Sequence, residues 1–157
     1  MAAILENPPV QQVRPLADGV ELHTAQGTFT ARRLVIAASA WTNQVLQGVG
    51  RVLPLTVTEE QVTYFSTPHL RQFAPERFPV WIWMDDPSFY GFPIYGESAV
   101  KVAQDVGGRP VTATTRSFDP DAENLARVQD FMRQVLPSAL GPILYTKTCL
   151  YTLTPDR

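Results

Sequence analysis

The sequence predicts an α+β fold, in which helices pack on one side of a mixed, mainly antiparallel β-sheet. Most of the 157-residue chain consists of short stretches where apolar and polar residues alternate, with turn residues between them. Two stretches show the apolar spacing of a helix, and they are segregated from the predicted strands. Fourteen prolines divide the chain into short elements. Segregated strands and helices favour this class over a doubly wound sheet.

The composition is that of one globular domain, long enough to bury a core. Hydrophobic residues make up 45% of the chain and charged residues 18%, so extended disorder is not expected. The net charge of −2, without a cluster of Lys or Arg, predicts no nucleic-acid partner. No apolar run reaches the roughly 20 residues that span a bilayer, and no signal-peptide pattern is present. We therefore expect no membrane association.

A single cysteine excludes an internal disulfide and any zinc site built on several cysteines. It fits a reducing compartment, and we expect a cytoplasmic location. The two histidines, His23 and His69, lack the spacing of a metal site, so no metal is predicted. Gly48-Val49-Gly50 follows a predicted helix and lacks a third glycine, which excludes a dinucleotide-binding fingerprint.

The chain begins with a predicted three-stranded meander. Strands are expected at Val10 to Leu16, Val20 to Thr24 and Thr28 to Ala31, because their apolar residues alternate. Turns at Ala17-Asp18-Gly19 and Gln26-Gly27 connect them.

A buried strand and a helix are predicted next. Leu34 to Ala38 is a continuous apolar run, as expected for a strand that is buried on both faces. Ser39 can cap the following helix, whose apolar stripe consists of Trp41, Val45 and Val49.

The next predicted strand contains an irregularity. Residues 53–57 are apolar at odd positions, whereas residues 62–64 are apolar at even positions. The polar run Thr58-Glu59-Glu60-Gln61 between them predicts a bulge or bend that restores the inward direction. Residues 66–79, which contain several prolines, predict a surface loop.

A second meander is predicted around residues 80–104. Strands are expected at Val80 to Met84, Phe89 to Tyr95 and Ala99 to Gln104. The turn residues of Asp85-Asp86-Pro87-Ser88 and Gly96-Glu97-Ser98 separate them.

Lys101 interrupts the apolar pattern of the third strand of this meander. Because side chains alternate across a strand, it is predicted to point away from the face of Val100 and Val102. The pattern alone favours a lysine that faces solvent over one with a function.

The end of the chain predicts a helix and a long strand. Asp119 and Pro120 give an N-cap and a proline at the first helical position, and Pro137 ends the helix. Ile143 to Thr154 alternates as a strand. The apolar stripe of the helix consists of Leu125, Val128, Met132, Val135 and Leu136.

Cys149 and Tyr151 lie two residues apart on the last predicted strand and therefore face the same side. A lone cysteine is typically a small buried apolar residue, and Tyr90, Tyr95 and Tyr151 fit core aromatics with hydroxyls at the rim. These patterns predict a soluble α+β domain but no function.

Four sequence blocks, in order, resemble a known family. They are GVELHTAQGTFTARRLVIAASAWTNQVL, LPLTVTEEQVTYF, FYGFPIYGESAVKVA and DPDAENLARVQDFMRQVLPSALGPILYTKTCLYTLTPD. Together they resemble the FAD-dependent amine oxidases of the sarcosine oxidase and N-methyltryptophan oxidase type, within the D-amino-acid oxidase superfamily. The resemblance implies a remnant of an FAD-binding domain at 1–50, a substrate-binding domain at 51–148 and a return segment at 149–157.

The resemblance also implies roles for individual residues. Cys149 matches the cysteine that attaches the flavin covalently, and Lys101 matches the lysine that assists oxygen reduction. A fixed ammonium stabilises the anion that forms as O₂ is reduced. Further expected contacts to the cofactor come from Val10, Ser39, Ala40 and Trp41.

The substrate pocket implied by the resemblance contains Tyr90, Tyr151, Asp105 and Trp81. Asp105 stands where better-known members have a histidine, so the substrate is expected to differ. Trp81 stands where a smaller residue is common, and it is expected to narrow the site. Ser39 replaces the usual glycine of its block.

The reaction implied is oxidation of a secondary amine or N-methyl amino acid with O₂ to an imine and H₂O₂. The glycine-rich strand–turn–helix that binds the FAD pyrophosphate has no counterpart in the sequence, so the chain is expected to be a fragment that by itself neither binds FAD tightly nor is active. Exposed strand edges would then favour a homodimer. The alternatives are a non-catalytic binding module and a dehydrogenase that passes electrons to a partner protein.

Overall fold

The computed structural model describes residues 3–6 and 9–156 and divides the chain into two compact units. One unit comprises the described residues of Met1–Thr56 and Thr152–Arg157, and the other comprises Val57–Tyr151. Among the described residues, no helix is long and apolar enough to cross a membrane.

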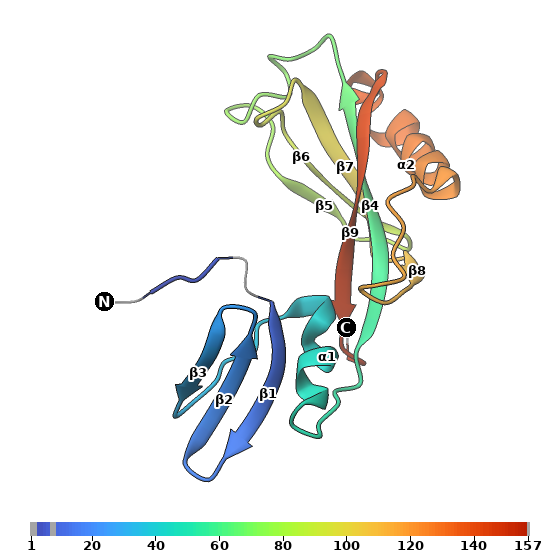
Figure 1. Ribbon diagram of the computed structural model, residues 1–157. Coiled ribbons are helices and arrows are strands. Elements are labelled where there is room, and N and C mark those ends of the chain that lie inside the picture. The colour runs from blue at the N-terminus through green and yellow to red at the C-terminus, as the bar shows by residue number, and fades with distance from the viewer. Residues whose placement is uncertain (1–2, 7–8, 157) are drawn as a thin grey trace. The chain divides into compact units, whose positions relative to one another are not determined.

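The first unit is a three-stranded antiparallel meander with a short helix beside its first strand (Figure 1). The strands are β1 (Val10–Leu16), β2 (Gly19–Thr24) and β3 (Gly27–Ala31), within a residue of the predicted bounds. The helix is α1 (Thr42–Gln47). It approaches β1 closely, since a Cβ on Gly48 would lie 2.9 Å from the carbonyl oxygen of Val13.

The strand predicted at Leu34 to Ala38 does not form. In the part of the chain that the structure describes, no strand pairs with residues 34–38, and Val35 is 88% exposed. A strand that is buried on both faces needs hydrogen-bonded neighbours along its edges. The apolar run alone could not show that these neighbours are missing here.

Ser39 does not cap a helix as predicted. Its φ of 44° lies in the left-handed region, and it begins a 3₁₀ turn, η1 (Ser39–Trp41). The Ser39 Oγ lies 3.3 Å from the Thr152 Oγ1 instead of bonding a backbone N–H group of the helix. Helix α1 ends at Gln47, so Val49 lies outside it.

The second unit is built on a sheet in the order β5-β6-β7-β4-β8, with β9 also paired to β4. The predicted second meander is confirmed, with its first two strands shorter than predicted and its third one residue longer. The strands are β4 (Thr56–Ser66), β5 (Trp81–Trp83), β6 (Ser88–Phe92), β7 (Ala99–Asp105), β8 (Arg109–Pro110) and β9 (Ile143–Leu153).

The bulge predicted within Thr58 to Gln61 is wrong, because β4 runs through these residues without a break and buries them. The irregularity lies in the facing chain instead. Strand β7 pairs with residues 62–66 of β4, and β8 pairs with residues 58 and 59. Between β7 and β8, Val106 and Gly107 have φ values of 58° and 124°.

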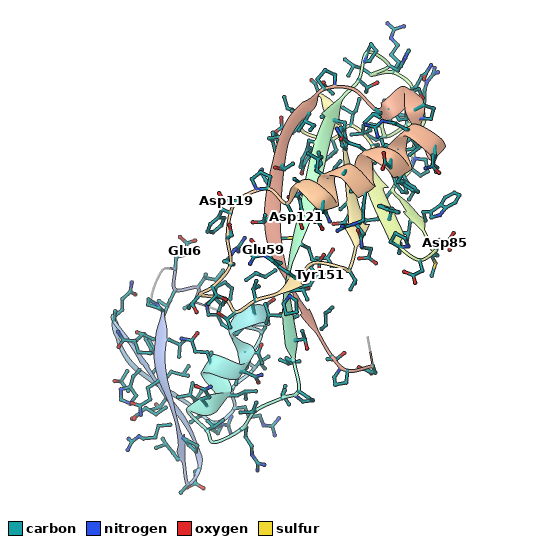
Figure 2. All side chains as sticks on the ribbon, turned by 90° about the vertical axis from the view of Figure 1, so that its right-hand side faces the viewer. Glu6, Glu59, Asp85, Asp119, Asp121 and Tyr151 are labelled. Carbon is teal, nitrogen blue, oxygen red and sulfur yellow. The ribbon has the colours of Figure 1, made fainter. Side chains whose placement is uncertain are left out.

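Helix α2 (Ala122–Val135) crosses one face of this sheet (Figure 2). The predicted stripe packs there, and Phe131, which the stripe did not include, stacks on Phe89 with ring centroids 4.2 Å apart. Leu136 caps the helix, and Pro137 begins the 3₁₀ turn η2 (Pro137–Ala139), so the predicted end is confirmed. The buried core consists of Phe65, Phe73, Phe89, Val100, Val102, Val128, Phe131, Met132 and Ala139.

The predicted N-cap of this helix, Asp119, is wrong by two residues. Asp121 is the cap, and its carboxylate accepts hydrogen bonds from the backbone N–H groups of Glu123 (2.8 Å) and Asn124 (3.0 Å). The side chain of buried Gln61 on β4 accepts from the Asp121 N–H at 2.7 Å and donates to its carbonyl at 3.1 Å. This tertiary contact places the start of the helix, and Figure 2 shows Asp121 at that end.

The cap assignment predicts that Asp121→Ala lowers the free energy of unfolding by about 1 kcal/mol, because two N–H groups of the first turn lose their acceptor. Asp119→Ala is the matched control, and it should change the free energy of unfolding by less than about 0.5 kcal/mol. Urea denaturation of both variants measures the difference. An equal or larger effect of Asp119→Ala would contradict the assignment.

Candidate functional site

Strand β7 separates the core from a second face of the sheet. Val100 and Val102 pack into the core under α2. Because side chains alternate along a strand, Lys101, Ala103 and Asp105 lie on the opposite face. We call this the tyrosine face; it carries Tyr64, Tyr90, Tyr145 and Tyr151 together with Lys101, Asp105 and Cys149.

A pair of tyrosine hydroxyls joins two strands of this face. The Tyr151 hydroxyl on β9 donates to the Tyr90 hydroxyl on β6 at 3.3 Å. Burial raises the pKa of Tyr90 far above its ordinary value, and the contact with Tyr151 adds to this. Burial also raises the pKa of Tyr151, and the carboxylate of Asp105 raises the pKa of both. Both hydroxyls are therefore neutral hydrogen-bonding groups at physiological pH.

Lys101 has no ion-pair partner among the described residues. It is half-buried, and its Nζ lies 4.7 Å from the ring centroid of Phe92, its neighbour on β6. The aromatic ring holds the ammonium without neutralising it. The charge therefore remains available to a negative group on this face.

Cys149 is a free, half-buried thiol on the same side of β9 as Tyr151. Burial raises the pKa of its thiol, and the carboxylate of Glu60 raises it further, whereas Lys101 and Arg116 lower it. The net shift is upward, so the thiol is protonated at neutral pH.

Glu60 is a functional candidate that the sequence analysis missed. Its side chain is 2% exposed and accepts from the Thr58 hydroxyl at 2.6 Å and from the Gly108 N–H at 3.0 Å. The even positions of β4 share a face, so Glu60 shares that of Val62 and Tyr64. The even spacing of Glu60, Val62 and Tyr64 in the sequence could have placed Glu60 on this face. The polar run was interpreted as a bulge instead.

Trp81 does not join these residues, which corrects its predicted place in the pocket. It pairs with Gly91 and stacks on Phe131 in the core, with ring centroids 5.8 Å apart. The adjacent Ile82 pairs with Tyr90, on the tyrosine face, and is 63% exposed. Adjacent residues of a strand point to opposite faces. The pairing register of β5 on β6 is therefore needed to decide whether Trp81 or Ile82 lies on the tyrosine face.

In the first unit, Val10 and Trp41 line a cavity of about 530 Å³. Its other lining residues are Pro9, Gln11, Gln12, Val13, Ala38, Gln44, Val45 and Gly48. Ser39 and Ala40 follow Ala38 in the chain but are not among the lining residues. Across the described residues, no cluster of three or more His, Cys, Asp or Glu side chains could hold a metal ion.

The predicted family is confirmed: residues 2–157 match the family described as FAD dependent oxidoreductase, and the chain belongs to it. Monomeric sarcosine oxidase of Streptomyces avermitilis is 37% identical over 158 residues, which cover 95% of this chain and 40% of the relative. N-methyl-L-tryptophan oxidase of Yersinia pestis is 29% identical over 158 residues, or 98% of this chain and 41% of the relative. The chain thus spans about two fifths of the length of these relatives.

Two solved structures share the fold of this chain. NikD, described as an unusual amino acid oxidase essential for nikkomycin biosynthesis, matches with a TM-score of 0.76 and 26% identity. The match covers 96% of this chain and 40% of NikD. Glycine oxidase from Geobacillus kaustophilus matches with a TM-score of 0.72 at 19% identity, over 98% of this chain and 38% of that enzyme. The predicted α+β class is confirmed.

The environment of Cys149 predicts slow thiol chemistry in the flavin-free protein. The midpoint pH of its alkylation by iodoacetamide should lie above the ordinary thiol pKa of about 8.5. Glu60→Gln should lower this midpoint because it removes a negative charge, and Lys101→Met should raise it. Mass spectrometry can follow the reaction without background, since the chain has one cysteine.

Exposed Glu76 provides the control, and Glu76→Gln should leave the midpoint unchanged. A midpoint that responds equally to Glu60→Gln and Glu76→Gln would show that Glu60 does not act on the thiol.

Proposed function

We propose that this chain forms the substrate-facing part of a flavin-dependent amine oxidase. The substrate is a secondary amine or N-methyl amino acid, oxidised at its CH–NH bond to an imine that water hydrolyses. O₂ takes up the two electrons and two protons and becomes H₂O₂. The observation that carries the proposal is that Lys101, Cys149 and the Tyr90–Tyr151 pair share one sheet face in a member of the FAD dependent oxidoreductase family.

The relatives supply the substrate class of this proposal. Two of them are named monomeric sarcosine oxidase and N-methyl-L-tryptophan oxidase. Their similarity extends over nearly the whole of this chain, including the segment that carries the tyrosine face.

The residues present fit FAD. The second unit offers Cys149, a free thiol for a covalent tether. The first unit offers a cavity of about 530 Å³ beside Val10 and Trp41, within the usual range of ligand pockets. When bound, FAD supplies the acceptor for a hydride and passes electrons to O₂. In the second unit Cys149 would tether FAD, and in the first unit the residues proposed to contact it are Val10, Ser39, Ala40 and Trp41.

The tyrosine pair orients the amine in this proposal. The Tyr151 hydroxyl donates a hydrogen bond to the Tyr90 hydroxyl. The Tyr90 hydroxyl can then donate its own hydrogen bond to the lone pair of an amine. Because burial keeps both hydroxyls neutral, they do not attract a proton to the nitrogen. Lys101 supplies a fixed positive charge where negative charge develops on oxygen.

Introduced into the full-length, flavin-loaded enzyme that the proposal implies, Lys101→Met should therefore slow the reoxidation of the reduced flavin by O₂ about 100-fold or more, because the stabilising charge is lost. Stopped-flow absorbance measures this rate, and a peroxidase-coupled assay measures H₂O₂. Lys147→Met is the matched control: this exposed lysine lies beside Tyr145, with its Nζ 4.8 Å from the ring centroid. It should change the rate less than two-fold.

An unchanged rate in Lys101→Met would remove the oxygen role from this lysine. Amine oxidation without any H₂O₂ would favour the dehydrogenase alternative over the oxidase.

The covalent tether is tested by Cys149→Ala. After acid precipitation of the flavin-loaded protein without the substitution, the flavin should stay in the pellet. After precipitation of the variant, the flavin should appear in the supernatant. Release from both proteins would mean that Cys149 is not the attachment point. Retention in the variant would place the bond elsewhere.

A further inference from the structure

Strand β7 carries two opposite charges on the tyrosine face. Lys101 and Asp105 are four residues apart, which corresponds to about 13 Å along a strand. Ala103 lies between them, is 1% exposed and pairs with Tyr90 on β6. Its small side chain lies between the positive end of this stretch at Lys101 and the negative end at Asp105.

The negative end lacks a counter-charge. Among the described residues, Asp105 takes part in no ion pair. Asp105 lies on the same face as Ala103, whose partner on β6 is Tyr90, and its negative charge raises the pKa of Tyr90 and Tyr151. A half-buried carboxylate without a partner is costly to keep, unless a ligand supplies the positive charge.

Other charged side chains of this unit, Glu60, Arg116 and Lys147, form no ion pair with Asp105. Glu60 adds a second carboxylate on β4, bonded to Thr58 and Gly108. The guanidinium of Arg116 is held by the carbonyl and hydroxyl oxygens of Thr148, at 3.0 and 3.2 Å. Lys147 on β9 lies beside the rings of Tyr64 and Tyr145. A cationic ligand group is therefore favoured near Asp105, and a carboxylate is repelled.

We propose that the substrate carries a second, distal cationic group that Asp105 binds, so that the substrate class is a diamine with one secondary amine. This inference rests on the proposed amine oxidation and specifies its substrate. Asp105 is then the residue that determines specificity. It selects a cationic tail by charge pairing and rejects an anionic tail by repulsion from Asp105 and Glu60.

Three amines that differ only at the distal end test the proposal. They share the group CH₃NH–(CH₂)₄– and end in an ammonium (N-methyl-1,4-diaminobutane), a methyl (N-methylpentylamine) or a carboxylate (5-(methylamino)pentanoate). The sulfur analogues, in which a thioether replaces the secondary amine, bind without being oxidised. Calorimetry of the flavin-loaded protein gives their Kd values, and peroxide formation gives kcat/KM for the amines.

The ammonium-ended sulfur analogue should bind at least about 10-fold more tightly than the other two, as expected for a charge-assisted contact. Asp105→Asn, which preserves shape and removes charge, should abolish this preference. Asp130→Asn should preserve it, because Asp130 lies on the exposed side of α2 and pairs with Arg133.

Binding and turnover separate the two proposals. Equal binding of the three tails, preference for the carboxylate, or a preference that survives Asp105→Asn would overturn the diamine assignment. Oxidation without tail preference would leave the amine oxidase proposal standing and overturn the diamine proposal. Preferential binding of the ammonium tail that depends on Asp105, without oxidation of the amine, would support the assignment of Asp105 and overturn the oxidase.

Discussion

The burial of Val100 and Val102 against α2 is the constraint on which the arrangement of the site depends. Because a strand has a side-chain period of two, burying these valines places Lys101 and Asp105 on the other face. A shift of one residue would exchange the faces, and a charged side chain would enter the core at a cost of several kcal/mol. The core therefore fixes both the fold and the direction of the reactive side chains.

Local patterns were sufficient where neighbours in the chain decide the structure. The hairpins of the first unit, the meander around β6 and the shared face of Cys149 and Tyr151 followed from turn residues and alternation. Prediction failed where distant contacts decide. Leu34 to Ala38 has no partner strand among the residues that the structure describes. Asp121 became the cap because Gln61 of β4 binds its backbone.

Most of the predicted site residues lie together in the structure, while their chemical roles stay predictions. Lys101, Asp105, Cys149 and the two tyrosines do gather on one face. Trp81 was included because of its position in a family pattern, but the register of β5 on β6 places Ile82 there instead. Glu60 was missed because its neighbours in the sequence are polar. Gly108 packs closely against it, since a Cβ at this position would lie 2.8 Å from the Glu60 Cδ and 2.0 Å from the Glu59 carbonyl oxygen.

One face of β7 stabilises the fold and the other carries the candidate site. This separation affects how the substrate preference of such a protein can change in evolution. The valines that stabilise the fold contact α2, whereas Asp105 stands at the last position of the strand, beside a loop held by Glu60. A substitution at position 105 changes the charge of the site without disturbing the packed interior. New substrate preferences can therefore arise on this strand by single steps that selection for a stable fold does not oppose.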